Sequence, residues 1–176
     1  RERLKSIYAA KSSIYLSTFI FNADKSSLKI VKALCKKSRQ GVDVRLLIDS
    51  FGGKGFFRNY QDKLRSKCGV GVLRFNPPAW GLNKLAYVIH EKLIIIDGET
   101  VHLGGNGIGN SYHHIKPASK FYHDIDIKVK GPTACWFQKR FIEDRLFATL
   151  PNMDSWLVQC FAKLNQMAEK SNGKKT

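Results

Sequence analysis

Apolar and polar residues alternate along this chain with two different periods, and each period predicts its own kind of element. In the first half, short runs that are largely apolar or alternate every second residue predict strands. These predicted strands are residues 13–21, 42–49 and 70–75. Apolar residues three and four apart predict a helix after the first strand, capped by Asp24 or Ser26 and ending at Gly41. Because short links join strand, helix and strand, we expect a βαβ unit with a parallel strand pair.

The second half carries a hairpin signal between two apolar runs. One strand is expected to end at Ile96, the pair Asp97-Gly98 turns the chain, and a second strand covers residues 100–103. A hairpin adds antiparallel pairing to the parallel unit. The sequence therefore predicts an α/β fold with a mixed β-sheet and helices on both faces.

The rest of the chain completes one domain. Residues 124–131 alternate strictly, which predicts a half-buried strand, and helices are expected from Thr133 and after Pro151. A length of 176 residues suits one core and is too short for two ordinary domains. We expect a single domain over residues 1–170 and a flexible basic tail at 171–176.

Positive charge is the compositional feature that changes this picture. Thirty Lys and Arg residues against fourteen Asp and Glu residues leave a net charge of +16. Such a field favours anionic partners, namely nucleic acid, anionic lipid surfaces or phosphorylated substrates. A solvated basic surface that only aids solubility is the plainer interpretation, and charge alone does not decide between them.

The four cysteines lie far apart and show no spacing typical of a zinc site. They are Cys35, Cys68, Cys135 and Cys160. We expect reduced thiols and hence a reducing compartment, although an even number is compatible with disulfides. No apolar run reaches the ~18 residues of a membrane span, and no signal peptide is recognisable. Because the chain opens on Arg1, we expect an excised domain or a processed product.

The glycine-rich segment at 50–57, SFGGKGFF, follows a predicted strand. A phosphate cradle and a flexible turn both fit that position, and the turn is favoured because the segment matches no P-loop spacing. Phe56, Phe57 and Trp80 would suit docking at a membrane interface if they lie on exposed loops.

His90 and Lys92 stand two residues apart in an otherwise apolar run, so both side chains are expected on one strand face. A neutral imidazole is nucleophilic near pH 7, and an ammonium group stabilises developing oxyanions. Placing the two together is costly unless an anion lies between them. The pair therefore predicts a site that binds an anion.

The stretch from His90 to Asp97 reads H-x-K-x-x-x-x-D, and Gly104, Gly105 and Asn106 follow it. This arrangement resembles the HKD motif of the phospholipase D superfamily. The succession STFIF, GVDVRLLID, RFNPP, HEKLIIIDG, GGN and HDIDIKVKGP is similar to one catalytic half of the bacterial cardiolipin synthase branch, over residues 5–147.

The resemblance implies an enzyme that transfers phosphodiesters on phospholipid through a phosphohistidine, of the cardiolipin synthase, phosphatidyltransferase or phospholipase D type. It implies no metal ion and no other cofactor. A metal-independent nuclease of the same superfamily, acting on DNA or RNA, is the alternative that the charge favours. A non-enzymatic interaction module is a third hypothesis, and the intact His90 and Lys92 argue against it.

The resemblance also implies roles for residues around the pair. His90 would be the nucleophile and Lys92 the oxyanion stabiliser. Asp97 would support the structure of the site, which agrees with its place in a hairpin turn, and Asp124 would orient the nucleophilic imidazole, with Asp126 as alternate. The residues expected to bind substrate are Gly104, Gly105, Asn106 and Asn110.

One residue departs from the family pattern. The family writes Gly-Gly-x-Asn or Gly-Ser-x-Asn, whereas here Asn106 falls one place early and Gly107 holds the expected position. Asn110 is therefore included as a substitute from a neighbouring turn.

The family's mechanism uses two HKD motifs that face each other, and this chain has one. His113, His114 and His123 lack the accompanying Lys and Asp, so we interpret them as loop or surface residues. The second motif is expected from a homodimer partner or from a missing second half. The other expected partner is an anionic phospholipid or membrane surface, with nucleic acid as alternative, and the expected location is the cytoplasmic side, peripheral to a membrane.

Overall fold

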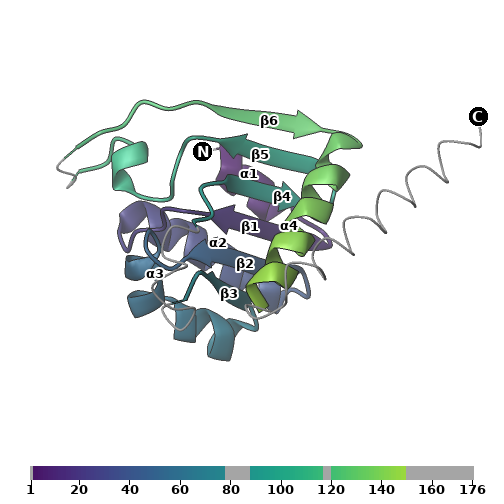
Figure 1. The fold of residues 1–176 in the computed structure, drawn as a ribbon, viewed down its shortest axis with the longest axis horizontal. Coiled ribbons are helices and arrows are strands. Elements are labelled where there is room, and N and C mark those ends of the chain that lie inside the picture. The colour runs from purple at the N-terminus through teal and green to yellow at the C-terminus, as the bar shows by residue number, and fades with distance from the viewer. Residues whose placement is uncertain (1, 78–87, 117–119, 150–176) are drawn as a thin grey trace, which may run out of the picture.

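The computed structural model of this protein describes residues 2–77, 88–116 and 120–149. The predictions for Trp80, for a helix after Pro151 and for a tail at 171–176 lie outside these described residues. Figure 1 shows the described residues as one sheet with helices in front of it and behind it.

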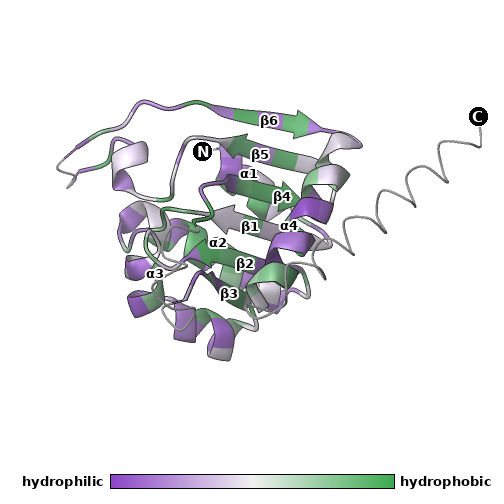
Figure 2. Ribbon diagram, viewed as in Figure 1, coloured by the Kyte–Doolittle hydropathy of each residue, from purple (hydrophilic) through white to green (hydrophobic). Residues whose placement is uncertain are grey.

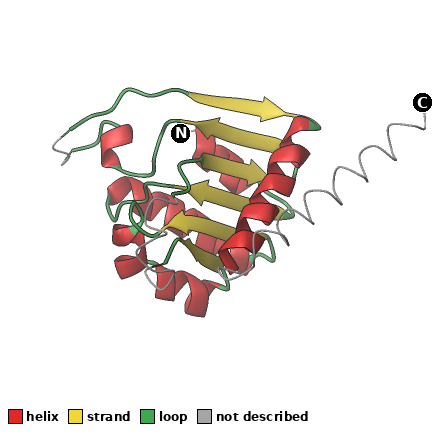
Figure 3. Cartoon of the chain, in the orientation of Figure 1, coloured by secondary structure: helices red, strands yellow, loops and turns green. Residues whose placement is uncertain are grey.

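A six-stranded sheet forms the middle layer, in the order β3-β2-β1-β4-β5-β6 (Figure 3). The strands are β1 (Ser13–Thr18), β2 (Asp43–Asp49), β3 (Gly71–Phe75), β4 (Lys92–Ile96), β5 (Thr100–Gly104) and β6 (Asp126–Lys130). β1 pairs in parallel with β2 and β2 with β3, whereas β4, β5 and β6 join the sheet through antiparallel pairs. The predicted parallel pair, the hairpin and the mixed sheet are therefore confirmed.

Helices cover both faces of this sheet, as the sequence predicts. The helical elements are α1 (Glu2–Ala9), α2 (Lys25–Arg39), α3 (Lys54–Asn59), the π-helical turn η1 (Lys63–Lys67), the 3-10 turn η4 (Asn110–Tyr112) and α4 (Thr133–Thr149). Alternate residues of β4 face two separate cores: Ile94 packs with residues of α1, α2, α3 and η1, and Ile95 packs beneath α4. Figure 2 shows β4 as hydrophobic along most of its length, as burial on both faces requires.

Asp24 begins α2, which decides between the two caps expected from the sequence. Its carboxylate accepts the backbone N–H groups of Ser26 and Ser27 at 3.0 and 3.1 Å, and Ser27 completes a capping box. Beyond the other end of α2, Gly41 has a φ of +87°, a conformation that glycine adopts with little cost.

Strand directions gather the predicted site at one edge of the sheet. Thr18 at the end of β1 pairs with Lys92 at the start of β4, and Gly104 at the end of β5 pairs with Asp126 at the start of β6. We call this side of the sheet the His90 edge. Asp97 follows the far end of β4 and lies at the opposite edge.

Two local predictions need correction. The segment expected as a flexible turn is a turn over residues 50–53 only, because α3 begins at Lys54. Phe56 is fully buried, with its ring 4.6 Å from that of Phe21. Phe56 therefore cannot dock at a membrane. β6, expected to be half-buried, is the outermost strand of the sheet, and all its residues except Val129 are exposed.

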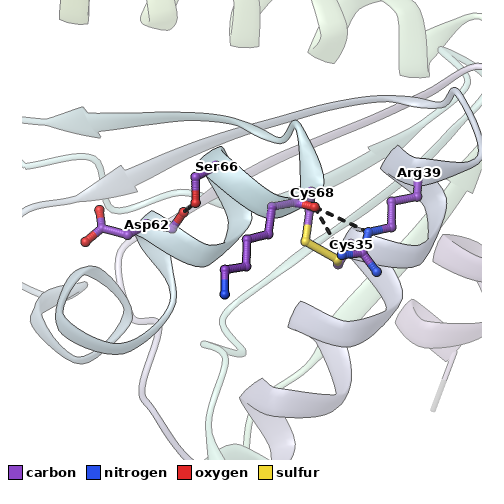
Figure 4. Close-up of a disulfide and its surroundings, with 6 residues drawn as sticks. Cys35, Arg39, Asp62, Ser66 and Cys68 are labelled. Carbon is purple, nitrogen blue, oxygen red and sulfur yellow. Dashed lines mark hydrogen bonds between the residues drawn. A yellow bond between two sulfur atoms is a disulfide. The ribbon is translucent and has the colours of Figure 1, made fainter.

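A disulfide joins Cys35 of α2 to Cys68, directly after η1 (Figure 4). This bond, between residues 33 positions apart in the sequence, corrects the expectation of four reduced thiols. Cys135 is a free and exposed cysteine. The expectation of a reducing compartment rested on four reduced thiols, so the disulfide leaves it without that support.

Candidate active site at the His90 edge

His90 and Lys92 lie in direct contact at the start of β4. The strand begins at Lys92, and His90, which is exposed, belongs to the loop just before it rather than to the predicted strand. The Lys92 Nζ lies 3.3 Å from each ring nitrogen of His90 and donates a hydrogen bond of 2.8 Å to its carbonyl oxygen. The predicted juxtaposition of an imidazole and an ammonium group is therefore present, although one of the two residues stands outside the strand.

Lys92 is unusual because it is a largely buried cation. It is 7% exposed, and burial lowers the pKa of its ammonium group. The carboxylate of Asp124 acts in the opposite sense, whereas the charge of Arg3 adds to the lowering. A desolvated cation beside an exposed imidazole is an arrangement that attracts a phosphate group.

Two contacts hold the segment that carries His90, one from Asp49 and one from Phe19. Asp49, at the end of β2, is 1% exposed, and its Oδ2 accepts the N–H of Ile89 at 3.2 Å. Its Oδ1 accepts the N–H of Phe51 at 2.8 Å, so one carboxylate links two loops. The ring of Phe19 lies 5.1 Å from that of His90. Sequence reasoning missed Asp49, although a carboxylate that ends an apolar strand is a recognisable signal.

Asp124 lies against the glycine pair that follows β5. A Cβ on Gly105 would overlap the Asp124 carboxylate, and one on Gly104 would overlap the carbonyl oxygen of Ile125. The absence of side chains at the two glycines therefore lets the start of β6 approach β5 closely. The sequence anticipated such an approach, but the group that makes it is this chain's own backbone and carboxylate.

Asp124 acts on the site through Lys92. Its Oδ1 accepts the N–H of Ile125 at 2.8 Å, and its charge reaches both Lys92 and Arg3. Within the described part of the chain no hydrogen bond joins Asp124 to His90, so its predicted role in orienting the imidazole stays a prediction.

Arg3 is a buried residue of the site that sequence reasoning did not identify. It donates to Asp126 at 2.6 Å and to the carbonyl oxygen of Asn106 at 2.9 Å. Burial lowers the pKa of Arg3, and Asp126 counteracts that effect. Asp126, the alternate to Asp124, is thereby committed to an ion pair that fastens α1 to β6.

Asn106 and Asn110 are placed differently from each other. The Asn106 side chain donates a long hydrogen bond of 3.4 Å to the carbonyl oxygen of Asp124 and lines a cavity of about 970 Å³ beside it. Asn110 is buried, and its Oδ1 accepts both the N–H and the hydroxyl of Ser26 at 3.1 and 2.9 Å. Asn110 therefore braces the first turn of α2, while its predicted contact with substrate stays a prediction.

Asp97 forms a clamp at the opposite edge of the sheet. Its carboxylate accepts the N–H groups of Lys11, Ser12 and Ser13 at 2.7 to 3.1 Å, and Asp97 itself has a φ of +54° in the turn. Burial acts to raise the pKa of Asp97, but hydrogen bonds from these three backbone groups outweigh it and the pKa is lowered. Asp97 is the hairpin corner that the sequence predicts.

The other histidines stand apart from the His90–Lys92 pair. His113, His114 and His123 are exposed in the segment between β5 and β6, with His114 stacked on Phe121. His102 of β5 is buried against Ser6 at 2.8 Å. Residues 2–77, 88–116 and 120–149 contain no cluster of His, Cys, Asp or Glu suited to a metal ion. The helices among them are each too short or too polar to cross a bilayer.

Comparison with known proteins identifies a family that matches most of this chain. Residues 4–144 match the protein family described as "Cardiolipin synthase, PLD-like domain". Cardiolipin synthase 1 of Bacillus anthracis is 32% identical over 158 residues, which are 88% of this chain and 31% of that protein. The major cardiolipin synthase of Bacillus subtilis (strain 168) is 33% identical over 142 residues, 80% of this chain and 30% of that protein.

Solved structures share the fold. The phosphatidylserine synthase of Haemophilus influenzae Rd KW20 matches with a TM-score of 0.60 at 20% identity, covering 81% of this chain and 33% of that one. Nuc of Salmonella typhimurium, a phospholipase D family member, matches with a TM-score of 0.56 at 24% identity, covering 80% of this chain and 82% of that one. The chain spans about a third of the length of the cardiolipin synthases it matches.

Proposed function

The chain belongs to the family of cardiolipin synthase PLD-like domains, and from that premise we propose that it supplies one half of an active site that transfers phosphodiesters on phospholipid. The observation that carries the proposal is the contact of His90 with the buried cation of Lys92 at an open edge of the sheet. The family resemblance inferred from the sequence is confirmed by the same matches.

In the first step, a ring nitrogen of His90 attacks the phosphorus atom of the lipid phosphodiester. A nitrogen–phosphorus bond forms while the bond from phosphorus to the leaving alkoxide breaks, and the alkoxide takes a proton from a second imidazolium. Lys92 stabilises the negative charge on the phosphoryl oxygens, which is greatest in the transition state. Its position beside both ring nitrogens of His90 suits that role.

In the second step, an alcohol or water attacks the phosphohistidine. The incoming hydroxyl gives its proton to the second histidine, and the nitrogen–phosphorus bond of His90 breaks. The second histidine comes from another HKD motif, on a further copy of this chain or on a longer polypeptide. Asp49 and Asp124 keep the first half of the site in place through Ile89 and Lys92.

A nuclease of the same superfamily is the second candidate, because the net charge of +16 also suits a polynucleotide backbone. Offering phosphatidylglycerol vesicles and single-stranded DNA in parallel, with and without EDTA, separates the two. We expect lipid turnover that EDTA leaves unchanged, since His90 and Lys92 supply the nucleophile and the positive charge. Cleavage of DNA with the lipid untouched would refute the lipid proposal.

Replacing His90 tests the nucleophile. We expect His90→Ala to lower turnover by about 10³-fold or more and to leave the fold intact, because the side chain is exposed. The measurements are phosphatidyl transfer, circular dichroism and acid-labile phosphate on the protein after a rapid quench. Phosphohistidine that persists in His90→Ala would show that another histidine is the nucleophile.

A further inference from the structure

The face formed by α1, α2 and η1 carries a band of lysines that the proposed chemistry does not use. Lys25, Lys29, Lys32 and Lys36 follow at intervals of four, three and four residues, so they lie within an arc of about 60° and span about 16 Å of α2. All four side chains are exposed, and α2 contains no acidic residue. The band is therefore a continuous row of positive charge.

These lysines have no acidic partner in the described part of the chain. The ion pairs on this side are those of Glu2 with Lys5 and with Lys128, at its border. The nearest aromatic contact of the row is that of Lys36, whose Nζ lies 5.9 Å from the ring centre of the half-exposed Tyr8. The charge of the row is thus available to an external anion.

A groove lies between α2 and η1 beside this row, with a volume of about 510 Å³. Its apolar lining consists of Leu28, Val31, Tyr60, Leu64 and the Cys35–Cys68 disulfide. Its cationic lining consists of Lys32, Lys36, Arg39 and Lys63, which are exposed. An apolar floor between cations fits a ligand that is anionic and amphiphilic.

The two walls of the groove are fastened to each other. The disulfide joins Cys35 on α2 to Cys68 after η1, and the guanidinium of Arg39 donates to the carbonyl oxygen of Lys67 at 3.1 Å (Figure 4). A groove whose walls are linked is already formed before a ligand arrives, which lowers the entropic cost of binding.

We propose that the α1–α2–η1 face docks on a bilayer containing anionic phospholipid, with one lipid headgroup held in the groove by Lys32, Lys36 and Lys63. The docking proposal rests on the proposed function, because both assume that the chain acts on phospholipid. The residues of the docking face are separate from His90. It replaces the docking site that the sequence suggested at Phe56, which is buried.

The lining of the groove favours lipid over nucleic acid. Single-stranded nucleic acid is held by aromatic rings on which bases stack. The floor of this groove is aliphatic apart from Tyr60, whose ring already contacts Phe56 edge-on at 6.2 Å. Lysines in a row attract an anionic bilayer without needing a fixed geometry.

Docking by this face also brings the His90 edge to the bilayer. β1 ends at that edge, and α2 begins after the short connection at residues 19–24. Ser26 in the first turn of α2 donates its hydroxyl to Asn110. Lys25 therefore lies at the end of the row next to the site, and Lys36 at the remote end. A bilayer along the row would lie beside the edge where a phosphodiester must enter.

The test uses the whole chain carrying His90→Ala, so that binding is measured without turnover. Flotation with vesicles of phosphatidylcholine, alone or mixed with phosphatidylglycerol, gives the partition coefficient. We compare Lys32→Gln/Lys36→Gln/Lys63→Gln with the charge-matched control Lys11→Gln/Lys120→Gln/Lys130→Gln, whose lysines are exposed elsewhere. Since one lysine near an anionic bilayer contributes roughly fivefold, we expect about 100-fold weaker partitioning for the groove variant and a far smaller loss for the control.

The possible outcomes separate this proposal from the proposed function. Equal losses in both variants, or no preference of the parent protein for phosphatidylglycerol, would overturn the docking proposal. If the groove variant lost binding to single-stranded DNA but kept its binding to vesicles, the docking proposal would be overturned and the face assigned to nucleic acid. Turnover of detergent-dispersed phosphatidylglycerol by the chain with His90 intact tests the proposed function independently.

Discussion

At the scale of the residue, the site depends on one group in contact with His90 and on others that act on it through a neighbour. Asp49 fixes the backbone before His90, and Lys92 lies beside its ring. Asp124 acts on Lys92 by charge alone. The exposed imidazole that we propose as the nucleophile thus has two buried polar neighbours, Asp49 and Lys92. Substitutions of these two residues are expected to alter turnover by changing the position of His90.

Asp97 provides a contrast, because it belongs to the signature but lies at the other edge of the sheet. We expect Asp97→Asn, which tolerates the positive φ, to lower the free energy of unfolding by about 1 kcal/mol and to preserve turnover. Urea unfolding and phosphatidyl transfer measure the two effects. Lost turnover in a stably folded variant would contradict a purely structural role.

Ionisation of the Asp97 carboxylate is expected to make the stability of the fold depend on pH. Because the pKa of Asp97 is lower in the folded chain than its ordinary value of 3.8, its contribution is present above that value and is lost as pH falls through the folded pKa. The difference in stability between Asp97→Asn and the parent should therefore shrink in acid. A difference that stays constant down to strongly acid pH would show that the ionised carboxylate is not its source.

Gly104 is expected to tolerate no side chain. Gly104→Ala would place a methyl group against the carbonyl oxygen of Ile125 and the Cα of Asp126, so β6 must move away from β5. We expect a loss of about 2 kcal/mol in unfolding free energy, measured by thermal denaturation. Gly41→Ala serves as a control for backbone strain without a steric clash. Gly41 has a φ of +87° and no atom within 4 Å of an added Cβ, so any loss of stability comes from the backbone conformation alone. If Gly104→Ala left stability and turnover unchanged, the close approach of β6 would be refuted.

At the scale of the element, the disulfide is the strongest link between α2 and the segment before β3. Closing a loop between positions 33 apart is expected to contribute about 4 kcal/mol by restricting the unfolded chain. Both Cys35→Ser/Cys68→Ser and a reductant should lower the midpoint of thermal unfolding. A midpoint unaffected by either would show that the bond does not form in solution.

Most elements could be predicted because their signals are local. Asp24 with its following serines, the Asp97-Gly98 turn and the β1–α2–β2 unit each occupy short stretches whose pattern suffices. The errors concern non-local facts. Burial of Phe56 depends on α3 folding back onto Phe21, and β6 is exposed because it ends the sheet that the described residues form.

The candidate site divides in the same way. His90, Lys92 and the glycine pair are recognisable from spacing within one stretch. In the structure His90 contacts Lys92, and the glycine pair lies against Asp124 and Ile125. Asp49 and Arg3 lie 41 and 87 positions before His90 in the sequence. They come to the same side of the sheet only through the folding of β2 and α1 against the other elements. The disulfide partners likewise lie on separate elements.

At the scale of the whole molecule, the chain presents one HKD motif and a site open at the His90 edge. The mechanism that we propose needs a second imidazole. When this chain is studied alone, that group must come from another copy, so we expect specific activity to rise with protein concentration. Turnover measured over a dilution series, beside light scattering for the molar mass, provides the test. Constant specific activity in a monomeric sample would remove the need for a second motif.

The exposed strand β6 has a practical consequence for anyone who handles the protein. Ile127 of β6 and Ile125 just before it are 56% and 78% exposed, and among the described residues no further strand pairs with the outer side of β6. Such a margin is a template on which other chains can add, and concentrated samples are prone to precipitate by that route. Lys128 and Lys130 on β6 oppose such association, because their positive charges repel the same charges on another copy of the strand. Salt screens this repulsion, so added salt should speed precipitation at concentrations that do not yet weaken the fold.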